Sequence, residues 1–343
     1  MKNILITGGA GFVGYHLALH AELNKADRVV LFDNLNDYYD PELKYGRLAQ
    51  LGFAVDGETP VMEEIKSGSR ENWSFFRGSL EQADHVNALF DKFGFDTVVN
   101  LGAQAGVRYS IENPQAYLDS NMQGFLNILE ACRNHPVDHL IYASSSSVYG
   151  ANKKTPFSED DSVDNPVSLY AATKKSNELM AHTYSHLYGI PCTGLRFFTV
   201  YGPWGRPDMA YFSFAQKITA GKTIQIFNNG DMMRDFTYVE DITESITRLF
   251  DRAPAKGDGG EAAARVLNIG HGSPVNLLEF VKEIETQLGM EADKEYMPMQ
   301  PGDVPVTYAD TSKLEALTGY KPRYNLAYGI GKFVEWFREY YNL

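Results

Sequence analysis

Short apolar runs alternate with amphipathic segments along the N-terminal part of the chain. The apolar runs are rich in Val, Ile, Leu and Phe and predict strands at 3–7, 28–33, 73–77, 96–101, 138–144 and 191–197. Apolar positions at helical spacing predict helices at 12–24, 81–93, 114–134 and 168–188. Alternating strands and helices are typical of a parallel sheet with both faces covered, so we expect an α/β fold with a doubly wound sheet.

The pattern changes near residue 198, after which Pro203, Gly205 and Pro207 interrupt the chain. Shorter elements follow, with a loop rich in Gly, Ala and Asp at 253–264. Segment 52–72 has little periodicity and is expected to be a surface insertion. Because 343 residues suit two lobes, we predict a larger domain of residues 1–198, with 236–270 packing back on it, and a smaller α/β lobe of residues 199–235 and 271–343.

Charge and cysteine content narrow the function classes. A net charge of −13 argues against binding to nucleic acid or to anionic membranes, because both need a basic surface. The sequence has no apolar stretch long enough to cross a membrane, and its first residues run directly into a short strand rather than a signal peptide. Cys132 and Cys192 are far apart in the sequence, so we expect no disulfide framework and a cytoplasmic protein.

A glycine-rich motif follows the first predicted strand and opens the first predicted helix: Thr7-Gly8-Gly9-Ala10-Gly11-Phe12-Val13-Gly14. Gly8 permits a tight turn, Gly11 allows the backbone to approach a pyrophosphate, and Gly14 allows close packing of helix on strand. Free N–H groups at the helix N-terminus favour the bound anion. Asp33 ends the second predicted strand, where its carboxylate can accept hydrogen bonds from an adenosine ribose and repel a 2′-phosphate. These features predict a Rossmann-type domain that binds NAD rather than NADP.

Tyr170 and Lys174 lie four residues apart in a predicted helix and therefore on one face of it. Upstream, a predicted strand ends in the serine run 144–147, at the edge where a parallel sheet lines a cofactor crevice. A tyrosine acts as a base near neutral pH only if its pKa falls from about 10 by about three units, or roughly 4 kcal/mol. A nearby ammonium and a cationic nicotinamide ring can cause this shift. A serine at the strand end can hydrogen-bond both the tyrosine and the substrate oxygen.

The glycine motif, the acid, the serine strand and Tyr-x-x-x-Lys, in this order and spacing, resemble the extended short-chain dehydrogenase/reductase family of sugar-nucleotide enzymes. The resemblance covers nearly the whole chain. It implies an enzyme that moves hydride and a proton to and from a sugar hydroxyl, with Tyr170 as the base and Lys174 as its ammonium partner. Ser145 matches the hydroxyl helper, and Ser144 and Ser146 stay open as substitutes.

The same resemblance implies how the two lobes and the subunits are used. The larger lobe would bind NAD, the smaller lobe would hold the nucleotide sugar, and a homodimer would pack through helices 114–134 and 168–188. The residues that match the family's NAD contacts are Gly8, Gly11, Phe12, Val13, Gly14, Asp33, Asn34, Leu101, Ala103, Asn121, Tyr170 and Lys174.

The serine run also bears on the type of reaction. Family members that eliminate water or decarboxylate carry an acid in the segment before Val-Tyr-Gly, which in this chain is Val148-Tyr149-Gly150. Here Ser145, Ser146 and Ser147 occupy that segment, so an acid or base for work at C5 or C6 is missing. Epimerisation needs only transient oxidation, rotation of the ketone and return of hydride to the other face. The serine run therefore favours an epimerase.

Three longer segments, 103–114, 201–209 and 299–304, resemble the UDP-glucuronate 4-epimerases of this family. This resemblance implies conversion of UDP-glucuronate to UDP-galacturonate through a 4-keto intermediate. It leaves three alternatives open: a 4-epimerase for a neutral UDP-hexose, a UDP-glucuronate decarboxylase, and a nucleotide-sugar-binding protein without catalysis.

The likeness to these epimerases also implies contacts with the sugar nucleotide. Thr199 and Arg206 would hold the sugar carboxylate. Arg234 would pair with the diphosphate, and Asp303 would bind the uridine ribose. Arginine suits such roles because its planar fork matches carboxylate and phosphate oxygens. The full set of predicted substrate-binding residues is Arg108, Ser145, Thr199, Arg206, Gln225, Phe227, Arg234 and Asp303.

The chain departs from the family pattern at two positions. Ser79 stands where an aspartate usually lies near the adenine, and Gly102 stands where alanine is more usual. The pairs His16/His20 and His182/His186 have helical spacing but lack a third ligand, so we expect no metal site.

Overall fold

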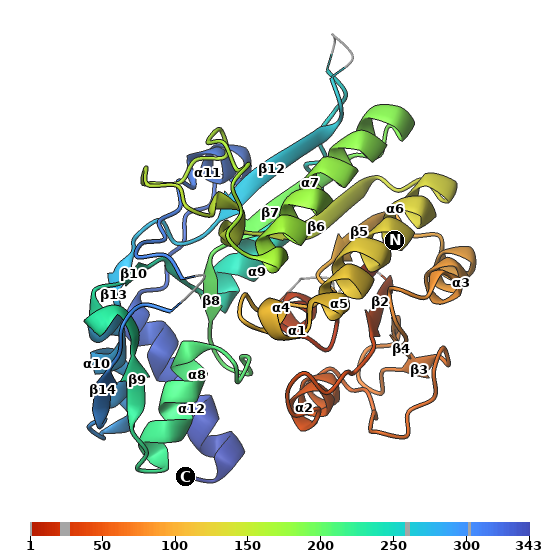
Figure 1. The fold of residues 1–343 in the computed structure, drawn as a ribbon. Coiled ribbons are helices and arrows are strands. Elements are labelled where there is room, and N and C mark those ends of the chain that lie inside the picture. Colours follow the sequence, from red (N-terminus) through yellow and green to blue (C-terminus); the bar gives the residue numbers. More distant parts are fainter. Residues whose placement is uncertain (1, 21–27, 258–260, 301–302) are drawn as a thin grey trace. The chain divides into compact units, whose positions relative to one another are not determined.

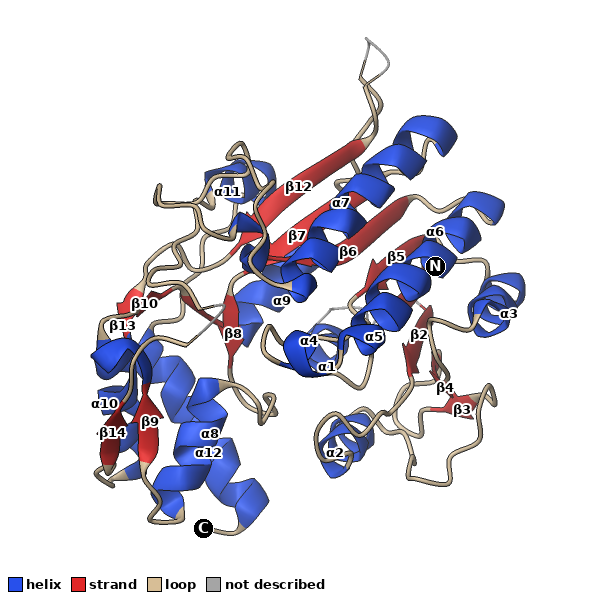
Figure 2. Cartoon of the chain, viewed as in Figure 1, coloured by secondary structure: helices blue, strands red, loops and turns tan. Residues whose placement is uncertain are grey.

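The computed structural model describes residues 2–20, 28–257, 261–300 and 303–343. The chain divides into two compact units, whose elements are shown in Figures 1 and 2. The first unit comprises residues 1–150, 162–196 and 243–267, and the second comprises residues 151–161, 197–242 and 268–343.

Among the described residues, eight strands form one sheet in the order β12-β7-β6-β5-β1-β2-β4-β3. Their bounds are β1 Asn3–Thr7, β2 Arg28–Asp33, β3 Ile65–Lys66, β4 Trp73–Arg77, β5 Thr97–Asn100, β6 His139–Ser145, β7 Cys192–Phe197 and β12 Ala264–Ile269. Parallel pairing joins β1 to β2 and β5, β2 to β4, and β5 to β6, whereas the short β3 is antiparallel to β4. The strand order reverses between β1 and β5, which confirms the predicted doubly wound α/β fold.

Helices cover the sheet of the first unit, and α3, α6 and α7 lie side by side on one face (Figure 1). The helices up to α9 are α1 Phe12–His20, α2 Glu42–Gln50, α3 Ala83–Phe93, α4 Tyr109–Glu112, α5 Pro114–Tyr117, α6 Gly124–Asn134, α7 Leu169–Tyr188, α8 Ala210–Thr219 and α9 Val239–Thr247. Leu5 and Val98 belong to the core cluster that α3 and α6 join, whereas their neighbours Ile4 and Val99 are equally buried outside it. Burial on both faces explains why the strands are continuous apolar runs.

The six predicted strands are confirmed within a residue or two, and so are the helices predicted at 81–93 and 168–188. The helix predicted at 12–24 is described as far as His20, and its last residues lie outside the described part. The helix predicted at 114–134 is instead α5, a π-helical segment Leu118–Gln123, and α6. We did not predict α2 or β3; β3 pairs over only two residues of the expected insertion, which is too short to produce a periodic pattern.

The second unit is built from short strand pairs and a layer of helices. Its other elements are β8 Thr199–Tyr201, β9 Ile224–Ile226, β10 Met233–Arg234, β11 Phe236–Tyr238, β13 Val275–Asn276, α10 Leu277–Leu288, β14 Lys294–Tyr296, α11 Ser312–Thr318 and α12 Leu326–Tyr341. β8 pairs in parallel with β11, and β9 with β14, whereas β10 is antiparallel to β13. The buried ring of Phe212 on α8 contacts Phe333 and Phe337 on α12, so aromatic packing joins these helices.

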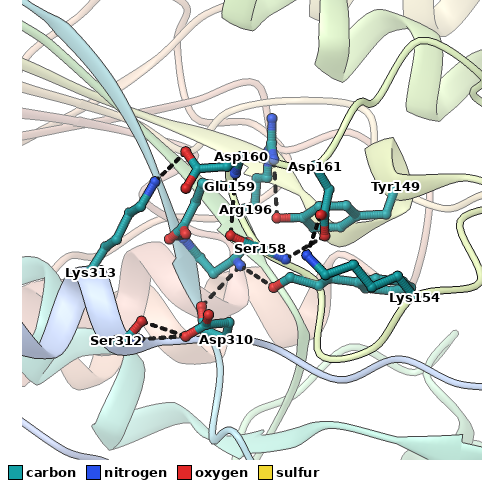
Figure 3. A network of polar contacts seen from close by, with 12 residues as sticks. Tyr149, Lys154, Ser158, Glu159, Asp160, Asp161, Arg196, Asp310, Ser312 and Lys313 are labelled. Carbon is teal, nitrogen blue, oxygen red and sulfur yellow. Dashed lines mark hydrogen bonds and ion pairs between the residues drawn. The ribbon is translucent and has the colours of Figure 1, made fainter.

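Segment 151–161 belongs to the second unit, whereas our predicted boundaries include it in the larger domain of residues 1–198. The backbone N–H of Phe157 donates to Tyr308 at 2.7 Å, and the N–H of Asp310 donates back to Phe157 at 2.9 Å. Lys313 forms an ion pair with Asp160 at 2.6 Å (Figure 3). These partners are about 150 residues away along the chain, so no local pattern reports them.

A buried ion pair connects α7 to β7 inside the first unit. Arg196 Nε lies 2.9 Å from Glu178 Oε1, and each side chain is only 4% exposed. Ser144 Oγ donates to Glu178 at 2.6 Å. Arg196 also donates to the Tyr149 hydroxyl at 3.0 Å, a bond drawn in Figure 3. Burial opposes the charge on Arg196, but its contacts with Glu178 and Tyr149 raise the pKa of the guanidinium above its ordinary value. The pair therefore holds the end of β6 against α7 and β7.

Replacing Arg196 with methionine should test this connection. Arg196→Met leaves the Glu178 carboxylate buried without its cation, so we expect the free energy of unfolding in urea to fall by about 3–5 kcal/mol. The double variant Glu178→Met/Arg196→Met should recover much of the loss. As a control, Lys313→Met breaks an exposed pair and should change stability by at most about 1 kcal/mol. An Arg196→Met effect no larger than this control would contradict the anchoring role.

Candidate active site

The turn from β1 into α1 leaves no room for side chains. Gly8 has a φ of +66°, and a Cβ built on it would lie 2.8 Å from the backbone nitrogen of Gly102. A Cβ on Gly11 would lie 2.9 Å, and one on Gly14 only 2.2 Å, from the Gly8 carbonyl oxygen. Phe12, which opens α1, is buried. The loop therefore presents bare backbone at a helix N-terminus, which fits the pyrophosphate of a dinucleotide.

Asp33 lies at the end of β2 with its carboxylate fixed beside this loop. Its Oδ2 accepts from Ala10 N at 3.2 Å, and its Oδ1 accepts from Leu35 N at 2.9 Å. Asp33 and the neighbouring Asn34 are both half-buried, so they can reach a ligand. The carboxylate thus stands where an adenosine ribose would need an acceptor.

The carboxyl ends of β1 and β5 meet at the reversal point of the sheet. Thr7 Oγ1 donates to Asn100 Oδ1 at 2.6 Å, and Gly102 N donates to Thr7 Oγ1 at 3.1 Å. Leu101 and Ala103 follow directly and are half-buried. The two predicted contact residues therefore lie on the segment that leaves this edge of the sheet, where ligands bind in doubly wound folds.

Arg47 on α2 supports the glycine loop and was not among the predicted site residues. Its side chain is fully buried, and Nη1 donates to the Ala10 carbonyl at 2.9 Å and to the Tyr39 hydroxyl at 2.6 Å. The Lys44 ammonium lies 5.2 Å from the centre of the Tyr39 ring. A signal was present in the sequence, because Pro41 precedes a short amphipathic segment that carries both cations.

Ser145 is the last residue of β6 and caps the 3₁₀ segment Ser146–Tyr149. Its Oγ accepts from Ser147 N at 3.2 Å and from Ser147 Oγ at 2.9 Å. Ser144 is buried, and its hydroxyl donates to Glu178. That bond makes Ser144 a structural group rather than a substitute for Ser145.

Tyr170 and Lys174 lie in the first turns of α7, as their spacing predicted. Ser168 caps this helix by accepting from Ala171 N at 3.1 Å. The Lys174 ammonium lies 5.9 Å from the centre of the Tyr170 ring and donates to the Ala143 carbonyl at 2.9 Å. Burial lowers the pKa of Lys174 to about 8. Tyr170 itself is half-buried, so a substrate can reach it.

Asn121 lies within the π-helical segment and is nearly fully buried. Its Oδ1 accepts from Gln104 N at 2.8 Å, while Nδ2 donates to Gln104 O at 3.0 Å and to Thr173 Oγ1 at 3.1 Å. The side chain therefore connects the loop after β5 to α7. Arg108, farther along that loop, is exposed immediately before α4.

Arg206 belongs to the second unit, where its guanidinium forms a two-point ion pair with Asp208. Nε and Nη2 lie 3.0 and 2.6 Å from the two carboxylate oxygens. Close packing shapes the loop, because a Cβ on Gly205 would overlap the Tyr211 hydroxyl at 1.7 Å. Asp208 thus fixes the plane of the guanidinium fork, and its oxygens contact the fork as a ligand carboxylate would.

Arg234 and Asp303 lie close enough in the second unit to interact electrostatically. Burial lowers the pKa of Arg234, while Asp303 acts in the opposite sense. Arg234 Nη1 donates to the carbonyls of Met233 and Pro305 at 3.0 and 3.1 Å. The next residue, Asp235, is fully buried and accepts three backbone N–H groups, two from residues 271–272 and one from Ala309. Asp235 thereby fixes the backbone that carries Arg234.

The remaining predicted residues of the second unit lie on strands or at their ends. Thr199 opens β8 and is half-buried, with its N–H bonded to the Asp235 carbonyl at 3.1 Å. Gln225 lies in β9 and donates to Glu295 at 3.4 Å, and Phe227 follows that strand. The substrate prediction is thus split, with Arg108 and Ser145 in the first unit and the other six residues in the second.

In the described part of the chain, no group of three or more His, Cys, Asp or Glu side chains is placed to hold a metal ion. Within the same residues, no helix combines the length and the apolar character needed to span a membrane.

Comparison with known proteins agrees with this geometry. Residues 4–270 match the NAD dependent epimerase/dehydratase family. The chain is 52% identical to protein CapI of Staphylococcus aureus over 99% of both chains, and 46% identical to UDP-glucuronate 4-epimerase 4 of Arabidopsis thaliana over 99% of this chain and 76% of that one. The crystal structure of UDP-glucuronic acid 4-epimerase from Bacillus cereus, in complex with UDP-glucuronic acid and NAD, matches with a TM-score of 0.86 at 31% identity, covering 99% of this chain and 100% of that one. The family match covers most of the chain, and the glycine loop after β1 agrees with it. The chain therefore belongs to the NAD dependent epimerase/dehydratase family.

Proposed function

We propose that this protein is an NAD-dependent UDP-sugar 4-epimerase that interconverts UDP-glucuronate and UDP-galacturonate through a 4-keto intermediate. The proposal rests on the presence of Ser145, Tyr170 and Lys174 in one unit, together with a serine run at the end of β6 that itself contains no acidic residue. Relatives named as UDP-glucuronate 4-epimerases, and a solved neighbour holding UDP-glucuronic acid and NAD, support the choice of sugar.

The glycine loop and Asp33 are the groups we assign to holding NAD. The loop offers backbone N–H groups to the pyrophosphate, and Asp33 offers carboxylate oxygens to the adenosine ribose. Bound NAD accepts a hydride from C4 of the sugar and returns it to the opposite face. We also assign to this site Phe12, Val13, Asn34, Leu101 and Ala103, which follow the ends of β1, β2 and β5, and Asn121, which hydrogen-bonds the loop after β5.

Tyr170 is the base that removes the proton from the C4 hydroxyl and later returns it. Lys174 stabilises the phenolate, because a buried ammonium near the ring favours the charged form of the tyrosine. Ser145 hydrogen-bonds the C4 oxygen, which loses its proton as the ketone forms. The serine run 144–147 contains no acid or base for C5 or C6, which supports epimerisation over elimination or decarboxylation.

The sugar carboxylate needs its own restraint. Oxidation of C4 places a ketone β to this carboxylate, and such acids lose carbon dioxide readily. We assign Thr199 and Arg206 to holding the carboxylate away from alignment with the ketone. Arg234 pairs with the diphosphate and Asp303 with the uridine ribose, and the other residues assigned to the sugar nucleotide are Arg108, Gln225 and Phe227.

We also propose a homodimer that works in the cytoplasm. The helices expected at the subunit interface expose Leu118, Leu179 and Leu187 at 44%, 56% and 61%, which is high for leucine side chains. Leu179 and Leu187 are eight residues apart on α7 and share one face. Sedimentation would distinguish a dimer from a monomer. Cys132 and Cys192 are buried free thiols, which fits a reducing compartment.

The reaction can be tested directly with purified protein. Incubated with UDP-glucuronate, the protein should change the sugar H4 signal in NMR without steady accumulation of NADH. Tyr170→Phe should keep its bound NAD but turn over at least about a hundredfold more slowly, because it loses the general base. Build-up of NADH during turnover would indicate a dehydrogenase, and near-normal activity of Tyr170→Phe would remove this residue from the mechanism.

The lowered pKa of Lys174 predicts the alkaline side of the pH profile. The ammonium supports the Tyr170 phenolate only while protonated, so kcat should fall as pH rises through about 8. Lys174→Arg keeps its charge at these pH values, and its residual rate should lack this fall. Lys175→Met, on the same helix, should retain it. A wild-type kcat that stays level well above pH 8 would mean that the charge of Lys174 is not required.

The role of Arg206 can be separated from a structural one by comparing two substrates. Arg206→Ala removes a charge-assisted clamp, so UDP-glucuronate turnover should fall by roughly 30- to 160-fold, corresponding to about 2–3 kcal/mol. A larger share of decarboxylated 4-keto-pentose product should appear by mass spectrometry. Turnover of neutral UDP-glucose should suffer much less. Equal losses on both substrates, without the decarboxylated product, would make Arg206 structural and leave an unspecified UDP-hexose as the substrate.

A further inference from the structure

The hydroxyl of Ser145 already accepts two hydrogen bonds from one neighbour. Ser147 N donates to Ser145 Oγ at 3.2 Å, and Ser147 Oγ donates to it at 2.9 Å. The first bond arises because Ser145 has extended backbone angles and caps the 3₁₀ segment Ser146–Tyr149. The second bond comes from a side chain that the proposed mechanism does not use.

Hydrogen-bond valence then limits what Ser145 can do. A serine hydroxyl has one proton to donate and two lone pairs with which to accept. Since Ser147 engages both lone pairs, Ser145 has only its proton left for a reacting group. We propose that Ser147 is a positioning residue that fixes the Ser145 hydroxyl as a donor toward the C4 oxygen; this inference rests on the proposed 4-epimerase function.

The direction of this hydrogen bond matters because the C4 oxygen changes its character during the reaction. As an alcohol, this oxygen carries a proton that a freely rotating serine could accept, which would stabilise the ground state. Once Tyr170 has taken that proton, the oxygen is an acceptor and needs donors. A hydroxyl held as a donor therefore favours the oxidised form and the transition state leading to it, and it needs no reorganisation at the moment of reaction.

The other serines of the run do not provide the same restraint. The hydroxyl of Ser144 donates to Glu178 Oε1 at 2.6 Å and is buried under the strand end. Ser147 is half-buried, so its methylene and hydroxyl can be changed without opening the core. Its backbone N–H bond to Ser145 would remain in any side-chain variant, which isolates the contribution of the hydroxyl.

The first test is a pair of substitutions at this one position. Ser147→Ala removes the Oγ donor, so kcat with UDP-glucuronate should fall about tenfold below the wild-type value, while KM changes by less than about twofold. Bound NAD and the thermal unfolding midpoint should stay at wild-type values. Ser147→Thr retains a hydroxyl and should recover most of the lost rate. Wild-type kcat in Ser147→Ala would overturn the proposal, as would failure of Ser147→Thr to recover the rate.

A double-mutant cycle separates action through Ser145 from direct contact with substrate. If Ser147 acts through Ser145, Ser145→Ala/Ser147→Ala should be no slower than Ser145→Ala alone. Losses that multiply in the double variant would show that Ser147 contacts the sugar itself and would overturn the positioning role. Wild-type protein that converts neither UDP-glucuronate nor UDP-glucose would instead overturn the proposed function, and the role of Ser147 with it.

Discussion

The reversal of strand order between β1 and β5 is the constraint on which the first unit depends. At that point the chain leaves neighbouring parallel strands in opposite directions, so their following loops separate and leave the strand ends accessible. The bond from Thr7 to Asn100 joins the two strand ends. The glycine loop, Asp33 and Ser145 all lie at the carboxyl ends of strands in this one sheet. A fold without this reversal would cover the same edge with crossover segments.

One side of helix α7 carries both Lys174 and the buried ion-pair residue Glu178. Tyr170, Lys174 and Glu178 follow one another at intervals of four residues, so the tyrosine that we propose as the base and the buried ion pair lie on the same side of the helix. Lys174 is held next to β6 by the Ala143 carbonyl, and Glu178 is held by Ser144 and Arg196. The helix can therefore keep a partly desolvated ammonium near Tyr170, because its next turn is anchored in the core.

The two arginines that we propose as substrate contacts, Arg206 and Arg234, lie in the second unit of a strongly acidic chain. With a net charge of −13, the protein can attract an anionic sugar nucleotide only through local groups. Arg206 is oriented by Asp208, and Arg234 is carried on a backbone that buried Asp235 holds through three N–H groups. One carboxylate thus orients Arg206 directly, and another fixes the backbone that carries Arg234. This arrangement suits ligands that bring carboxylate and phosphate groups of their own.

The sequence by itself determined the elements and the chemistry that depend on local order. Strand periodicity, the glycine turn and the spacing of Tyr170 and Lys174 are local properties, and the doubly wound sheet follows from their alternation. Tertiary structure alone decided the rest, because it depends on partners remote in the chain. Arg47 hydrogen-bonds the glycine loop from a helix that we did not predict. Segment 151–161 pairs with residues near 310, and the Ser144 hydroxyl donates to buried Glu178. Hydrogen-bond partners and burial of this kind arise from packing, which no pattern of neighbouring residues records.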